Sequence, residues 1–132
     1  MKKVVISGSS KLQSKLNYWR RYFKDNNYKI LDFPKIVGKS ELKDAYTNFY
    51  KNIDICDILF VMNEEKDGIK GYIGPNTFSE LTYAIMQNQN HNSNIKIYLL
   101  NMPSSNVACF NEIKFFLSNN WISLFYKSDL EV

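Results

Sequence analysis

The chain has 132 residues, of which 45% are hydrophobic, 15% aromatic and 23% charged. These are the proportions of a globular protein that buries roughly two thirds of its unfolded surface, and they exclude an intrinsically disordered chain. The length favours one domain over residues 1–132. The net charge of +4 is scattered along the chain, whereas a protein that binds nucleic acid polymers needs a clustered basic stripe.

The sequence also argues against a membrane or redox protein. No stretch approaches the roughly 18 to 20 apolar residues of a membrane span, and the first ten residues lack a signal-peptide core. We therefore expect a cytoplasmic protein without membrane partners. Cys56 and Cys109 lie in apolar surroundings without CxxC spacing, so we expect buried reduced thiols and no metal or other cofactor.

The apolar pattern predicts strands that alternate with helices. The continuous β-branched run at 4–6 is typical of a buried parallel strand. Leu16, Trp19 and Phe23 then recur at helical spacing. In chain order, the predicted elements are a strand at 4–6, a helix at 12–26, a strand at 28–33, a helix from Ser40, a strand at 53–62, a helix at 77–89, an exposed turn at 87–94 that contains His91, a strand at 95–100, a helix at 108–117 and a strand at 121–125.

This alternation predicts a three-layer α/β/α sandwich of the flavodoxin or Rossmann-like kind. Parallel strands need crossover helices, and these crossovers are right-handed in nearly every case. The commonest order for five mostly parallel strands is 2-1-3-4-5. Ligands of such sheets bind beyond the carboxyl ends of the strands, where the first and third strands diverge. Two loops are expected there, at residues 7–10 and 63–76.

The first of these loops has the composition of an anion or sugar site. Gly8 allows a tight turn, while Ser7, Ser9 and Ser10 offer hydroxyl groups before a predicted helix start. A phosphate or a ribose would fit, although the same residues also make ordinary turns. The loop is neither a P-loop nor a GxGxxG fingerprint.

The second loop leads into a helix that carries one carboxylate near its start. Thr77 and Glu80 have the spacing of a capping box, which alone would explain both residues. Alternatively, Glu80 lies off the apolar stripe of the helix and faces the mouth of the sheet. An ionised carboxylate beside a ribose-binding loop can stabilise or capture the oxocarbenium character that develops in N-glycosidic cleavage.

Three segments together resemble the nucleoside 2-deoxyribosyltransferase-like superfamily, which includes deoxyribosyltransferases and nucleotide N-hydrolases. They are the strand end at 6–8, the segment at 53–63, and the pattern that runs from Gly71, Tyr72 and Gly74 through Thr77 to Ala84. The resemblance spans residues 3–102. It implies cleavage or transfer of the N-glycosidic bond of a nucleoside or nucleoside 5′-monophosphate.

The resemblance also implies roles for individual residues. Glu80 would attack or stabilise the anomeric carbon, and residues 7–10 would hold the sugar or its 5′ substituent. Asn63, at a predicted strand end, would bond a ribose hydroxyl or serve only as a loop residue. A homo-oligomer, most simply a dimer, would complete the pocket, and the aromatic segment at 110–126 offers a dimer face.

One departure from the family pattern leaves the function open. The family places an acid for the leaving base about eight residues before the position of Asp57, and that place falls near Asn48. Asp54 or Asp67 would have to replace it, while Asp57 either takes part directly or makes local hydrogen bonds at a strand start. The rival hypothesis is a catalytically inactive nucleotide-binding or sensory module of the same fold.

Overall fold

The structure is a computed structural model that describes residues 1–130. Its strands and helices alternate along the chain, and two short 3-10 helices lie at Lys39–Glu41 and Lys127–Leu130. The elements are β1 (Lys3–Ser7), α1 (Gln13–Asp25), β2 (Lys29–Asp32), α2 (Leu42–Ile55), β3 (Ile58–Val61), α3 (Pro75–His91), β4 (Lys96–Leu99), α4 (Phe110–Ser118) and β5 (Ser123–Leu124).

The five strands form one sheet in the order β2-β1-β3-β4-β5, which confirms the predicted order. Every neighbouring pair is parallel, so the sheet is parallel throughout rather than mostly. All the strands therefore end at the same edge of the sheet. Side chains of the loops that follow β1, β2 and β3 meet there.

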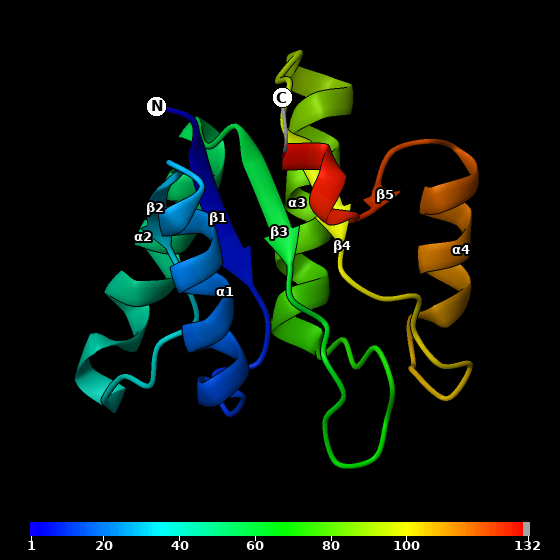
Figure 1. Cartoon of the computed structure of the whole chain (residues 1–132), viewed down its shortest axis with the longest axis horizontal. Helices are drawn as coiled ribbons and strands as arrows, with labels where there is room; N and C mark the ends of the chain where they lie inside the picture. The colour runs from blue at the N-terminus through cyan, green and yellow to red at the C-terminus, as the bar shows by residue number, and fades with distance from the viewer. Residues whose placement is uncertain (131–132) are drawn as a thin grey trace.

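Helices cover both faces of the sheet, and this gives the three predicted layers. Alternate residues of β1 point to opposite faces: Val4 and Ile6 pack with α1, whereas Val5 packs in the core under α2 and α3. Figure 1 shows α1 on one side of the sheet, with α2 and α3 on the other. After β1 the chain enters α1 on one face of the sheet, and after β2 it enters α2 on the other face. The ends of these two strands therefore border a crevice.

Two predicted boundaries around α2 are wrong. The strand expected at 53–62 is confined to Ile58–Val61, because residues 53–55 complete α2 instead. Phe49 and Ile53 are one helical turn apart, and both are buried on the same helix face, which holds this last turn in the helix. The helix expected from Ser40 begins as the 3-10 turn Lys39–Glu41 and becomes α-helical at Leu42.

The helix expected at 77–89 is longer at both ends. It begins at Pro75, whose fixed φ suits a first helical position. It ends at His91, where Asn92 adopts the left-handed conformation that terminates many helices. The exposed turn predicted at 87–94 is therefore largely helical, and His91 lies in the last turn of α3.

Both cysteines are free and buried, as their surroundings predicted. Burial raises the pKa of the Cys56 thiol to about 12, so this thiol stays protonated at neutral pH. Among residues 1–130, no helix has the length and apolar character needed to cross a bilayer.

Phe23 is the centre of an aromatic cluster between α1 and the sheet. Its side chain is 0% exposed and its ring lies within 6.4 Å, centroid to centroid, of those of Trp19, Phe60 and Phe125. We expect Phe23→Ala to lower the free energy of unfolding by about 3–5 kcal/mol, measured by urea denaturation. Phe115→Ala is the matched control, because Phe115 is 55% exposed, and its effect should stay below about 1 kcal/mol. Equal losses in the two variants would show that the core is not where we place it.

Candidate functional site

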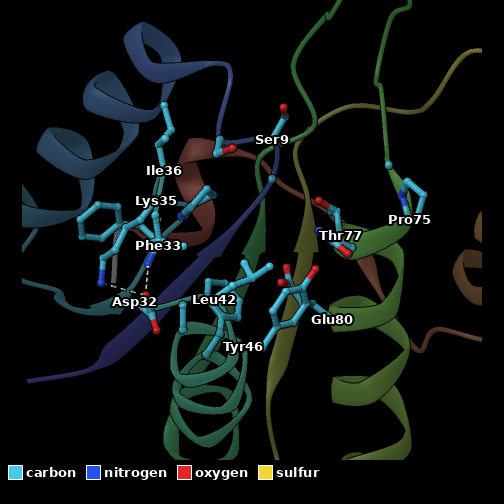
Figure 2. A pocket seen from close by; sticks show the side chains of 18 of the residues that line it. Ser9, Asp32, Phe33, Lys35, Ile36, Leu42, Tyr46, Pro75, Thr77 and Glu80 are labelled. Carbon is cyan, nitrogen blue, oxygen red and sulfur yellow. Dashed lines mark hydrogen bonds and ion pairs between the residues drawn. The ribbon is translucent and has the colours of Figure 1, made fainter. Parts of the chain in front are cut away.

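A cleft of about 550 Å³ opens at the carboxyl ends of β1 and β2, beside the start of α3. Figure 2 shows it from close by. One wall is the loop after β1 with Gly8, Ser9 and Ser10. A second is the segment at 32–37 together with the first half of α2, and the third is formed by Lys66, Tyr72 and the first turns of α3.

Glu80 projects from the second turn of α3 into this cleft (Figure 2). The hydroxyl group of Ser7, at the end of β1, donates a hydrogen bond of 2.5 Å to its Oε1. Ser7 itself is 0% exposed, so its side chain supports Glu80 rather than reaching a ligand. The contact joins the middle of the sheet to α3 and aims the carboxylate at the cleft.

The start of α3 rules out the capping-box explanation of Glu80. Gly74 is the N-cap, Pro75 is the first helical residue, and no side chain caps the helix. Thr77 lies inside the first turn and is buried, while Glu80 is bonded to Ser7 instead of to its own helix start. The carboxylate is thus held against the end of β1, in the same cleft that the loop with Ser9 lines.

The surroundings of Glu80 favour its neutral form. Burial is the main cause that raises its pKa from 4.5 to about 7, and repulsion from the nearby Asp32 carboxylate adds to it. The hydrogen bond from Ser7 acts in the opposite direction, because it stabilises the charged form. Glu80 therefore keeps its proton to a higher pH than an ordinary glutamate does.

Asn63 serves the structure of the cleft rather than lining it. Its side chain donates to the carbonyl oxygens of Asn101 (2.6 Å) and Gly71 (3.3 Å) and accepts from the Asn101 amide (2.9 Å). These bonds tie together the loops that follow β3 and β4 and use the polar atoms of a residue that is 1% exposed. Asn63 therefore has no free polar atom with which to bind a ribose hydroxyl, the role that the sequence suggested for it.

Gly71 is likewise a packing residue. It has a φ of 64°, and a Cβ atom there would lie 2.6 Å from the Cα of Pro103. Only glycine allows the loop at 63–76 to pass this close to the segment after β4. Tyr72 and Gly74, which follow it, do line the cleft, as does Lys66, whose ammonium lies 4.5 Å from the centre of the Tyr72 ring.

The two aspartates proposed as catalytic lie outside the cleft lining. Asp54 is in the last turn of α2 and accepts hydrogen bonds from Tyr83 (2.6 Å) and Gln87 (2.8 Å) of α3. Asp57 precedes β3, at the edge of the sheet opposite the cleft, and accepts from the Lys3 amide at 2.7 Å. Both carboxylates hold secondary-structure elements together.

Sequence reasoning missed the wall built by β2 and α2, because it considered only the divergence of β1 and β3. Asp32, the last residue of β2, lines the cleft with Phe33 and Lys35, and so does Asn48 of α2. The predicted order already placed β2 beside β1, so the carboxyl end of β2 was the available signal. Among residues 1–130, no three His, Cys, Asp or Glu side chains gather as a metal site would require.

No protein-family model, curated protein or solved structure matches this chain. The resemblance to the nucleoside 2-deoxyribosyltransferase-like superfamily therefore stays a prediction, as does the homo-oligomer that it implies.

The close approach of the loop at 63–76 to Pro103 predicts that Gly71→Ala strongly destabilises the protein. The added methyl group meets the backbone of Pro103 and occupies an unfavourable φ, so the free energy of unfolding should fall by about 2 kcal/mol or more. Gly38→Ala is the control, since nothing lies within 4 Å of its Cβ position and its stability should change by less than about 1 kcal/mol. Thermal or urea denaturation measures both, and a neutral Gly71→Ala would contradict the close approach of the two loops.

The raised pKa of Glu80 predicts that stability falls with increasing pH. In the unfolded chain the carboxyl loses its proton near 4.5, whereas in the folded protein it keeps it up to about 7. Between these values the folded state binds more protons, so the free energy of unfolding decreases as the pH rises, by about 3 kcal/mol in total. Glu80→Gln should remove this dependence of stability on pH. The control Glu112→Gln, at an exposed position, should keep it. Denaturant titrations at pH 4.5 and 8 measure the free energy of unfolding of both variants.

Proposed function

We propose that this protein cleaves or transfers the N-glycosidic bond of a nucleoside or nucleoside 5′-monophosphate, with Glu80 as the reacting carboxylate. The observation that carries the proposal is the Glu80 side chain, fixed by Ser7 and open to a cleft large enough for a nucleotide. Pockets of roughly 300–1000 Å³ are typical of small-molecule sites.

The two ends of the cleft differ chemically, and this supports an orientation for the ligand. Leu42 and Tyr46 present apolar and aromatic surface that suits the flat face of a base, whereas the Phe33 ring already contacts the Arg20 guanidinium, 3.8 Å from its centre. At the other end, the hydroxyl groups of Ser9 and Ser10 and the amino end of α3 suit a sugar hydroxyl or a phosphate. A ligand that spans both ends would carry its sugar past Glu80.

The reaction needs Glu80 in its ionised form. As the bond between C1′ and the base nitrogen breaks, its electron pair leaves with the base and positive charge develops at the sugar. The carboxylate stabilises this charge or forms an ester with C1′, which water or a second base then resolves. The hydrogen bond from Ser7 favours the ionised form and holds it in position.

A nucleotide-binding module without catalysis is the second candidate. The amide of Asn48 lines the cleft in the region where the resemblance calls for an acid, which is the observation that favours this alternative. Such a module would be stabilised thermally by a nucleotide and would release no base from it.

Base release after incubation with nucleosides and their 5′-monophosphates, followed by chromatography, tests the proposal. We expect Glu80→Ala to lower kcat/KM by about 100-fold or more, because the developing charge loses its counter-charge. Asp54→Asn is the matched control, since Asp54 lies outside the cleft, and it should retain activity within about threefold. Activity that survives Glu80→Ala would refute the role of this residue.

The pH dependence tests the contact between Ser7 and Glu80 separately. Activity of the unaltered protein should rise through an apparent pKa near 7 as Glu80 ionises. Removing the donor in Ser7→Ala should move this midpoint to higher pH, whereas Ser7→Thr, which keeps a hydroxyl group, should restore it. A midpoint that stays the same in Ser7→Ala would show that the hydrogen bond does not control Glu80.

A further inference from the structure

The base is proposed to lie against the cleft wall formed by the segment after β2 and by α2. In this wall, amide and apolar groups surround one acid, Asp32, whose oxygens already have partners. Asp32 and Glu80 are the acids among the described lining residues. Glu80 must be ionised to act on the sugar, so it cannot at the same moment give a proton to the base. The state of Asp32 therefore decides how the base can leave.

Both carboxylate oxygens of Asp32 already have partners. Its Oδ1 accepts from the Phe33 amide at 2.9 Å and lies 3.2 Å from the ammonium of Lys35, while its Oδ2 accepts from Asn52 at 2.9 Å. The residue is only 6% exposed. Protonating it would give up the ion pair with Lys35 and a hydrogen bond to the charged form, so these contacts oppose a role as acid.

Asn48 and Tyr46 are the polar side chains that α2 places in this wall, beside the apolar Leu42 and Phe49. The Asn48 amide can donate a hydrogen bond but transfers no proton, and a phenol such as that of Tyr46 is a far weaker acid than a carboxyl group. An ordinary purine or pyrimidine leaves as an anion unless it is protonated, and this protonation is the step for which the wall is poorly equipped. A base that already carries a positive charge leaves as a neutral molecule and needs no acid.

Resting on the proposed function, we propose that the substrate is an N-glycoside with a cationic base, most simply a pyridinium nucleoside or nucleotide. The bond between C1′ and the ring nitrogen breaks, and its electron pair neutralises the ring. Glu80 stabilises or captures C1′. Water then supplies the oxygen that ends on C1′, any ester to Glu80 breaks to restore the carboxylate, and one proton passes to solvent.

The charges around the cleft suit a cationic ring. The carboxylates of Asp32 and Glu80 repel each other across it, and a positive ring between them would relieve this repulsion and favour ionised Glu80. The two lining lysines are already engaged, because Lys35 pairs with Asp32 and Lys66 lies over the ring of Tyr72. The aromatic surface of Tyr46 offers a favourable face for a cation.

A comparison of nicotinamide mononucleotide with AMP and dAMP tests this inference, with base release followed by chromatography. We expect kcat/KM for nicotinamide mononucleotide to exceed that for AMP by at least about 100-fold, and its pH profile to rise to a plateau. Comparable rates for AMP or dAMP, or a profile that falls again at high pH, would overturn this inference and leave the proposed function standing. No release from any of the three would overturn this inference, and the panel of nucleosides and 5′-monophosphates set out above would then test the proposed function separately.

Asn48→Asp separates the role of the wall from the intrinsic reactivity of pyridinium glycosides. An acid at this place should raise the ratio of AMP to nicotinamide mononucleotide cleavage by about tenfold or more, because only the adenine needs a proton. Thr47→Asp is the control, since it adds the same charge one residue away, outside the cleft lining, and should leave the ratio unchanged. An equal ratio in Asn48→Asp and Thr47→Asp would overturn the placement of the base beside Asn48.

Discussion

The hydrogen bond between Ser7 and Glu80 is the contact on which the rest of the site depends. Ser7 is the last residue of β1, inside the sheet, and Glu80 stands in the second turn of α3, so one short bond links two elements that are 73 positions apart in sequence. Without that donor, burial and the Asp32 charge would act on Glu80 unopposed. The bond therefore sets where the carboxylate points and, in part, when it is charged. A carboxyl group poised near neutral pH in an open cleft is characteristic of functional sites.

The architecture supplies the opening into which Glu80 projects. Because α1 and α2 pack on opposite faces of the sheet, the ends of β1 and β2 are left uncovered between them, and the start of α3 closes the third side (Figures 1 and 2). The loop before α3 holds its course through Asn63 and Gly71, which fasten it to the segment after β4. Both residues belong to the segments that carry the family resemblance, yet in the structure they position Tyr72 and the start of α3.

Much of the fold could be predicted from local patterns, whereas the site could be predicted only in part. Strand order followed from alternation and crossover handedness, and Glu80, Ser9 and Ser10 followed from their places at strand and helix ends. Periodicity could not reveal that Ile53 continues α2, since a short apolar run fits a strand as well as a helix. Nor could periodicity show that the side chains of Asp57 and Asn63 form hydrogen bonds with backbone groups, because those partners are distant in sequence. Asp32 was missed for a different reason: only the divergence of β1 and β3 was considered, although the predicted strand order already placed the end of β2 beside β1.

The chemistry of the cleft depends on a Glu80 carboxyl group that is partly buried, held by Ser7 and accessible from the cleft. The most direct measurement is an NMR titration of the ¹³C-labelled glutamate side chains, with the Glu80 signal assigned by its loss in Glu80→Gln. We predict a midpoint near 7 for this carboxyl group, well above the 4.5 of an unperturbed glutamate. A midpoint near 4.5 would mean that Glu80 is fully solvated and unconstrained, and it would contradict the site as described.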